Sequence, residues 1–157
     1  METAKAFPGE SFIMVCMKST FATQEYYDGL IEKASKIKNL QFIEHVTAGG
    51  DAMNELYKYA KIFYNTSVFE GLPTTFIQAG KNMTPIISLN INPEQFLDIY
   101  KCGFFCENKL EYLYSNVEKL LNNKDLIKEM SINSLRYVEE NHNLKKNIKK
   151  LINLINS

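Results

Sequence analysis

The sequence has no excess of charge of either sign and no hydrophobic run long enough to cross a membrane. Its 157 residues include 18 Lys or Arg and 18 Asp or Glu, so the formal net charge is zero. A neutral chain creates no long-range field that would attract nucleic acid. The N-terminus also lacks the basic and then apolar layout of a signal peptide. We therefore expect a cytoplasmic protein that does not bind nucleic acid.

Cysteine is scarce, and its pattern argues against disulfides and metal. Cys16, Cys102 and Cys106 are odd in number and lie in or beside apolar runs. They lack the paired spacing and the histidines that a zinc site requires, and no acidic pair has the spacing of a metal clamp. The two histidines, His45 and His142, suggest no catalytic role. We predict reduced thiols, no metal site and no cofactor.

Strand-like and helix-like segments alternate along the first two thirds of the chain. The run SFIMVCM is continuously apolar, which is typical of a strand buried on both faces of a parallel sheet. The predicted strands span residues 11–17, 40–46, 61–67, 85–90 and 103–107, and the predicted helices span residues 23–37, 51–60, 73–83 and 93–100. This alternation predicts an α/β fold with a Rossmann-like parallel sheet flanked by helices.

The last third of the chain is expected to be helical. Apolar stripes over residues 110–121 and 126–138 predict two helices packed on the sheet. The final segment, residues 143–157, carries apolar residues on one face and four lysines elsewhere. Such a basic amphipathic helix can lie on a membrane surface, or it can dock on the domain with its lysines in water. We predict the docked arrangement.

The stretch NTSVFEGLPTTFIQAGKNMTPIIS, residues 65–88, contains the strongest candidate for a binding site. In an open parallel sheet, ligands bind outside the carboxyl ends of the strands. Gly71 lets the backbone approach a ligand closely, and Pro73 fixes the start of the next helix. The free N–H groups of that first turn suit a phosphate, and the hydroxyls of Thr74 and Thr75 can add hydrogen bonds.

Glu70 would repel a phosphate, but its carboxylate can accept hydrogen bonds from the hydroxyls of a sugar. A nucleotide sugar combines both kinds of group. The alternative is that Glu70 only stabilises the N-terminus of its helix electrostatically. Gln78, eight residues further on, either reaches back to the same site or lies on the helix surface. A dehydrogenase is disfavoured because the sequence lacks a G-x-G-x-x-G turn.

The segment SVFEGLPTTFIQAGKNMTPIIS resembles the C-terminal domain of retaining glycosyltransferases of the GT-B class, family 4. The shared pattern is a serine, two variable residues and Glu-Gly, then a helix with a second glutamate, and a strand that begins with proline. The resemblance covers about residues 1–142. It implies one half of a GT-B fold, which binds a nucleoside diphosphate sugar as the donor and transfers the sugar, without a metal, to an acceptor hydroxyl with retention.

The resemblance also assigns roles to individual residues. Glu70 matches the first glutamate of the family, which contacts the donor sugar, and we take it as the catalytic candidate. Gln78 stands where the second glutamate would bind the ribose, and an amide can still accept and donate hydrogen bonds there. The remaining matches are Ser67, Gly71, Leu72, Pro73, Thr74 and Thr75 in the loop and at the diphosphate, and Val46 and Thr47 near the nucleobase.

The sequence departs from the family pattern at three places, and part of the family's chain is missing. Met83 replaces a common glycine, Cys16-Met17-Lys18 replaces a turn that contains glycine, and Gln78 replaces a glutamate. The family's first strand, its basic residues and its N-terminal acceptor domain should precede residue 1. We therefore predict a nucleotide-sugar-binding domain over residues 1–142 that lacks its first strand and is inactive alone, followed by the helix of residues 143–157. A peripheral membrane contact of the full-length enzyme stays open as the alternative to the docked helix. The alternative is a non-catalytic GT-B-like interaction module.

Overall fold

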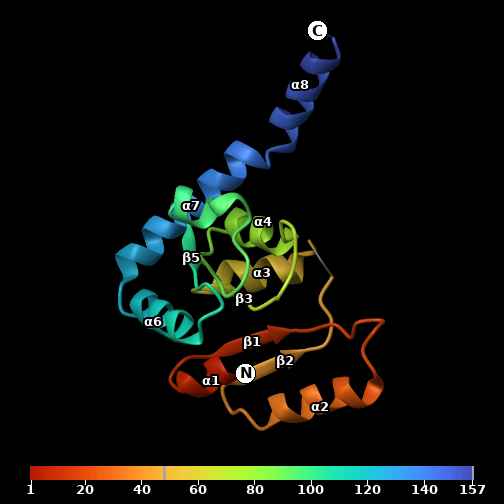
Figure 1. Ribbon diagram of the computed structural model, residues 1–157, viewed down its shortest axis with the longest axis vertical. Coiled ribbons are helices and arrows are strands. Elements are labelled where there is room, and N and C mark those ends of the chain that lie inside the picture. The colour runs from red at the N-terminus through yellow and green to blue at the C-terminus, as the bar shows by residue number, and fades with distance from the viewer. Residues whose placement is uncertain (48, 157) are drawn as a thin grey trace. The chain divides into compact units, whose positions relative to one another are not determined.

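The computed structural model describes residues 1–47 and 49–156 and forms two compact units, Met1–Met53 and Asn54–Ser157. The first unit contains a two-stranded parallel sheet, with Phe12 opposite Leu40. Helix α2 packs on this sheet (Figure 1). Its elements are α1 (Glu2–Ala6), β1 (Phe12–Val15), α2 (Gln24–Ser35) and β2 (Leu40–Ile43), and α3 (Asp51–Tyr59) begins here and ends in the second unit.

Local hydrogen bonds fix the ends of these elements. The hydroxyl of Thr23 accepts the N–H of Tyr26 at 3.2 Å and so caps α2. The side-chain amide of Asn39 donates to three carbonyl oxygens, those of Ala4 (2.8 Å), Phe7 (3.0 Å) and Glu10 (2.8 Å). This one side chain therefore ties α1 and the following turn to the start of β2.

The burial of β1 differs from the prediction. Ile13 and Val15 are 50% and 38% exposed, and half-buried and exposed positions alternate along the strand. The expectation that residues 11–17 are buried on both faces is therefore wrong. A run of apolar residues shows that both faces can be buried, but layers on both sides of the sheet are needed to bury them.

The second unit contains a three-stranded parallel sheet in the order β3-β4-β5, with β4 (Ile86–Ser88) in the centre. All three residues of β4 are buried, as expected for a central parallel strand. The other elements are β3 (Phe63–Asn65), α4 (Thr74–Lys81), the short 3-10 helix η1 (Pro93–Gln95), α5 (Phe96–Ile99), β5 (Gly103–Phe105), α6 (Leu110–Leu121), α7 (Lys124–Asn141) and α8 (Leu144–Ile155).

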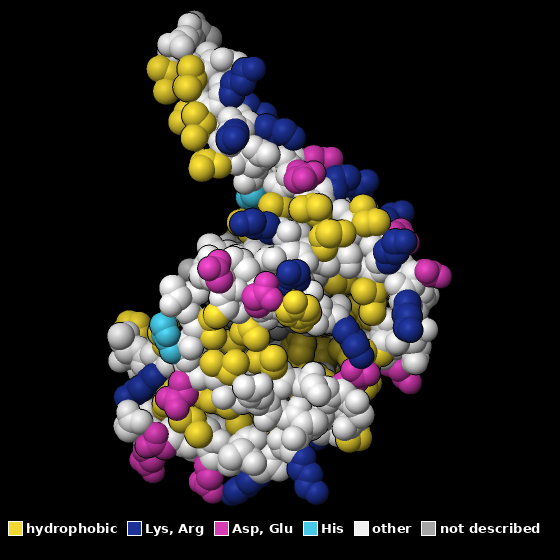
Figure 2. Space-filling view, turned by 180° about the vertical axis from the view of Figure 1, so that it is seen from behind, with side chains coloured by type: hydrophobic (Ala, Val, Ile, Leu, Met, Phe, Trp, Pro, Cys, Tyr) yellow, Lys and Arg dark blue, Asp and Glu magenta, His cyan; other side chains and the backbone are white. Residues whose placement is uncertain are grey.

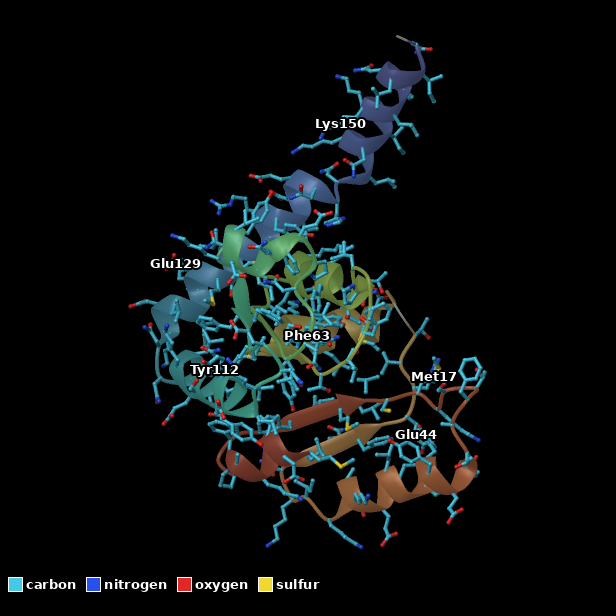
Figure 3. All side chains as sticks on the ribbon, in the orientation of Figure 1. Met17, Glu44, Phe63, Tyr112, Glu129 and Lys150 are labelled. Atoms are coloured by element: carbon cyan, nitrogen blue, oxygen red, sulfur yellow. The ribbon has the colours of Figure 1, made fainter. Side chains whose placement is uncertain are left out.

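A row of aromatic rings forms much of the core of the second unit. Phe63, labelled in Figure 3, lies 6.2 Å from Phe76 between ring centroids, and Phe76 lies 5.7 Å from Phe96. Phe96 in turn stacks on Tyr137 of α7 at 4.5 Å. These contacts join β3, α4, α5 and α7. They therefore fix the position of α4, the helix that follows residues 66–73.

The close packing of α4 on α7 depends on a glycine. A Cβ atom at Gly80 would lie 2.8 Å from Cγ2 of Val138 and 3.0 Å from the carbonyl oxygen of Ser134. Real Cβ atoms essentially never come so close to another heavy atom. Gly80 therefore allows the two helices to approach each other, and this contact holds α4, the helix that follows residues 66–73, in place.

The α/β class and the parallel pairing are confirmed, and the order of helices and strands follows the prediction. The described strands pair as a two-stranded sheet in the first unit and a three-stranded sheet in the second. Helix α8 forms as expected, but its predicted packing on the domain is not found, since none of its residues is buried. The assignment of residues 1–142 to one nucleotide-sugar-binding domain stays a prediction.

Candidate functional site

A shallow pocket of about 290 Å³ opens in the second unit, between the loop that follows β3 and the loop that follows β4. Both loops leave the carboxyl ends of neighbouring parallel strands, which is where ligands bind in open α/β sheets. The lining residues are Val68, Phe69, Glu70 and Gly71 from the first loop and Asn90, Ile91, Asn92 and Pro93 from the second.

A chain of hydrogen bonds orients Glu70. Asn65, buried at the end of β3, accepts the N–H of Ser67 at its Oδ1 atom (2.8 Å). The side-chain amide of Asn90 donates to the carbonyl oxygen of Ser67 (3.0 Å), and the hydroxyl of Ser67 donates to Oε1 of Glu70 (3.2 Å). Two asparagines from adjacent strand ends thus hold the serine that contacts the carboxylate.

The second wall of the pocket is held by bonds of its own. The hydroxyl of Ser88 accepts the N–H of Ile91 at 3.2 Å. Asn92 accepts the N–H of Leu97 (3.2 Å), and its amide donates to a carboxylate oxygen of Asp98 at 2.6 Å. These bonds connect the wall to the start of α5, so both sides of the pocket are fixed by the fold.

The N-terminus of α4 follows the first loop and has no side-chain cap among the described residues. Pro73 is buried at the cap position, and its carbonyl oxygen accepts the N–H of Phe76 at 3.0 Å. Thr74 is exposed and Thr75 is half-buried. The first turn carries no acidic residue. The N-terminal N–H groups and the helix dipole therefore remain available to an anion.

Most of the predicted site residues lie at or near the pocket of the second unit, and two belong to the first unit. Glu70 and Gly71 line the pocket, Ser67 contacts Glu70, and the segment Leu72, Pro73, Thr74 and Thr75 leads from the pocket into α4 without lining it. Gln78 is half-buried in α4, one turn after Thr74, and does not line the pocket. Val46 and Thr47 belong to the first unit, where the carbonyl oxygen of Thr47 accepts the N–H of Gly50 at 3.0 Å.

The sequence analysis did not single out Asn65 and Asn90. Each lies at or just beyond the carboxyl end of a strand, with Asn65 ending β3 and Asn90 two residues after β4. A polar residue at the carboxyl end of a parallel strand was the feature of the sequence that could have indicated their role. The contact of Asn90 with Ser67 joins residues that are 23 positions apart, so it depends on the pairing of β3 with β4.

Two backbone positions explain unusual residues in this region. Gly71 has no atom within 4 Å of a built Cβ and no positive φ, so neither packing nor backbone conformation of the chain requires a glycine there. Met83, by contrast, has φ of 58°, in the left-handed region that favours glycine. The structure thus shows a strained methionine where the resembling family commonly has glycine.

The cysteines and His142 do not form a reactive centre. Burial raises the pKa of the Cys102 thiol to about 12 and also raises the pKa of Cys106, so both thiols stay protonated at neutral pH. Burial lowers the pKa of His142, whose Nε2 lies 3.0 Å from the hydroxyl oxygen of Tyr137. No group of three or more potential metal ligands occurs among the described residues.

Residues 20–151 match the model of the family "Glycosyl transferases group 1". A protein from Haemophilus influenzae, named "Uncharacterized glycosyltransferase", is 32% identical over 93 residues, which are 57% of this chain and 26% of that protein. This chain therefore spans about a quarter of the length of that relative. In the part of the chain that the structure describes, no helix is long and apolar enough to span a membrane.

Solved structures show the same fold. A mutant of S. aureus TarM in complex with Fondaparinux, alpha-GlcNAc-glycerol and UDP matches with a TM-score of 0.77 and 21% identity, over 99% of this chain and 31% of that one. The C-terminal domain of a glycosyl transferase group 1 family protein (LpcC) from Francisella tularensis has a TM-score of 0.68 and 15% identity, over 91% and 75%. Because the family model covers most of its length, the chain belongs to the group 1 family of glycosyl transferases.

Proposed function

We propose that this chain is the donor-binding, C-terminal half of a GT-B glycosyltransferase of family 4. The parent enzyme would transfer a sugar from a nucleoside diphosphate sugar to an acceptor hydroxyl with retention. One observation carries the proposal: Glu70 lines a pocket at the carboxyl ends of two parallel strands, four residues before the uncapped N-terminus of α4. The UDP and the sugar derivative in the TarM complex support a nucleotide sugar as the ligand.

The two ends of such a ligand need different chemistry, and this loop offers both. The N–H groups and the dipole of α4 attract the diphosphate, and the hydroxyls of Thr74 and Thr75 can add hydrogen bonds. Glu70 accepts hydrogen bonds from the sugar. The hydroxyl of Ser67 occupies its Oε1 atom, which leaves Oε2 for the ligand. Since the fold does not require a glycine at Gly71, close approach of the ligand gives a reason for that residue.

Transfer of the sugar leaves negative charge on the departing diphosphate. The helix N-terminus stabilises part of this charge, and electrostatic stabilisation of this kind is usually the largest catalytic contribution. The basic residues expected in a preceding segment would supply the rest. We assign Gln78 to the ribose and Val46 and Thr47 to the surroundings of the nucleobase. Without the N-terminal acceptor domain, the chain alone would be inactive, because a two-domain enzyme reacts in the closed cleft.

We also propose that the full-length enzyme is cytoplasmic and makes a peripheral contact with a membrane. The chain has no net charge, which argues against nucleic acid as a partner. The membrane contact is supported by the basic amphipathic character of α8.

Titration calorimetry of this chain with a panel of nucleotide sugars and the matching nucleoside diphosphates tests the donor site. We expect Glu70→Gln to weaken binding of the preferred nucleotide sugar by about 10- to 100-fold, because hydrogen bonds to a charged group contribute about 1.5–3 kcal/mol. Affinity for the diphosphate alone should stay the same or rise, since a negative charge is removed. Glu129→Gln, an exposed glutamate of α7 labelled in Figure 3, is the matched control. Unchanged sugar-nucleotide affinity in Glu70→Gln would remove that residue from the site.

The second candidate function is a non-catalytic GT-B-like interaction module. Gln78 favours it, because an amide replaces the glutamate at the ribose position of the resembling family. Gln78→Glu separates the two functions. A rise in nucleotide-sugar affinity would indicate a ribose site in use, whereas no binding by either form would favour the interaction module.

A further inference from the structure

The loop that carries Glu70, residues 66–72, has little side-chain packing to hold it. Val68, Phe69 and the three residues that follow them are all exposed. The shape of the loop therefore depends on its hydrogen bonds. Among the residues that the structure describes, Asn90 is the one residue outside β3 and the loop itself that hydrogen-bonds to this loop.

The side-chain amide of Asn90 lies against two main-chain carbonyl oxygens of the loop, those of Thr66 (3.4 Å) and Ser67 (3.0 Å). A carbonyl oxygen can only accept a hydrogen bond, so the NH₂ group of Asn90 must face both of them. Each of its two hydrogens then has an acceptor in the loop. The amide group of Asn90 therefore acts on the main chain of the loop and has no hydrogen left to donate to a ligand.

Asn90 reaches the loop from a firmly held position. The N–H of Leu89, the residue before it, donates to the carbonyl oxygen of Asn65 at the end of β3 (2.9 Å). The carbonyl oxygen of Leu89 accepts the N–H of Asn108, just beyond β5, at 2.7 Å. The main chain before Asn90 is thus bonded to the segments on both sides of β4, so its amide is a fixed support for the loop.

We propose that Asn90 is a positioning residue for Glu70. It holds the main chain at Ser67, whose hydroxyl donates to Oε1 of Glu70 (3.2 Å), and in this way it sets the direction in which the carboxylate meets the donor sugar. The inference rests on the proposed function, because it requires Glu70 to bind the sugar. Asn90 acts through Ser67 and Glu70 rather than by touching the ligand.

This role affects one end of the ligand only. The diphosphate is assigned to the N-terminus of α4, and that helix is held separately by fully buried Phe76 and by its packing on α7. Without the amide of Asn90, the loop would have to become ordered when the sugar binds, and the entropy lost at that step weakens binding. We expect Asn90→Ala to weaken nucleotide-sugar binding about 3- to 10-fold, the usual net contribution of a hydrogen bond, with unchanged affinity for the diphosphate.

Asn133→Ala is the matched control. Asn133 is also half-buried in the second unit, and its amide also donates to a distant main-chain carbonyl oxygen, that of Lys101 at 3.1 Å. It does not line the pocket. Figure 2 shows acidic and basic side chains interspersed over much of one face, and neither asparagine substitution changes the net charge. Both variants therefore keep the long-range attraction for the diphosphate, and Asn133→Ala should leave both affinities unchanged.

Titration calorimetry of the chain with the preferred nucleotide sugar and with its nucleoside diphosphate tests the inference in a double-mutant cycle. In the Glu70→Gln background, Asn90→Ala should cause no further loss of nucleotide-sugar affinity, because the group that Asn90 positions is already changed. Ser67→Ala removes the hydroxyl that contacts Glu70 and leaves the end of β4 intact. It should produce the same selective loss as Asn90→Ala, and no loss in Ser67→Ala would overturn the inference.

Three further results would overturn it. An equal loss from Asn90→Ala with and without Glu70→Gln would show that Asn90 contacts the ligand directly. Equal losses of nucleotide-sugar and diphosphate affinity, or an equal loss in Asn133→Ala, would assign a general structural role to the Asn90 contact. Nucleotide-sugar binding that Asn90→Ala leaves unchanged would refute the inference alone. No nucleotide-sugar binding by the original chain would refute the proposed function and the inference with it.

Discussion

Gly80→Ala tests the helix contact that supports the candidate site, because two opposing effects act on the same side chain. In a helix interior, replacing glycine by alanine stabilises by about 1 kcal/mol. At this position the new methyl group would lie 2.8 Å from Cγ2 of Val138 and 3.0 Å from the backbone oxygen of Ser134. Overpacking of this kind costs about 1–3 kcal/mol. Since a backbone oxygen cannot rotate away, we expect the clash to win by about 1 kcal/mol.

The chain contains a matched control for this change. Gly29 lies within α2, and a Cβ built there has no atom within 4 Å. Gly29→Ala should therefore stabilise the first unit by about 0.5–1 kcal/mol. Urea denaturation followed by circular dichroism measures both variants, because the chain has no tryptophan to report by fluorescence. Amide hydrogen exchange assigns each change to its unit.

A double variant separates the two contacts of the new methyl group. With Val138→Ala in place, Gly80→Ala should cost about 1 kcal/mol less than it does alone, because only the contact with Ser134 remains. If Gly80→Ala stabilised the chain as much as Gly29→Ala does, α4 and α7 would not approach each other as described. The position of α4 against α7 would then have to be revised.

Three further predictions concern backbone strain, thiol reactivity and pH. Met83→Gly should raise the free energy of unfolding by about 1 kcal/mol, because the residue has φ of 58°; a loss measured by urea denaturation would contradict this reason. Iodoacetamide should modify the half-buried Cys16 in the folded chain. It should modify Cys102 and Cys106, which are fully buried, only after the chain unfolds, and mass spectrometry of peptides measures both results. The pKa of His142 is lowered from 6.5, so its contribution to stability is complete above pH 6.5 and is lost as the pH falls through the lowered pKa. The variant H142Q should show a flatter dependence of stability on pH there.

Patterns that depend on neighbours along the chain were readable from the sequence. The apolar run at residues 85–90 predicted the buried strand β4, and helical spacing predicted α2 and α6. The expected helix over residues 93–100 is instead a short 3-10 helix followed by α5. Glu94 and Gln95 interrupt it with φ of 51° and 55°. Neither glutamate nor glutamine is typical of the left-handed backbone region, so the kink at these two residues could not be predicted.

Features that depend on the partner of a segment were not readable. The apolar run at residues 11–17 predicted burial on both faces, but no sequence pattern shows how many layers will cover β1. The same limit applies to α8, whose stripe was expected to dock on the domain. At the candidate site, Glu70 and the loop were predicted from local pattern. The role of Asn90 required the register of β3 against β4.

Asn65 and Asn90 bind the loop before Glu70 through the main-chain N–H and carbonyl oxygen of Ser67. Val68 and Phe69, at the tip of that loop, are 85% and 93% exposed and contribute little to the core. Their side chains can be randomised in a library while the anchoring amides keep the carboxylate in register. The ligand preference of the candidate pocket, which both side chains line, can therefore be varied at these two positions with little loss of thermal stability.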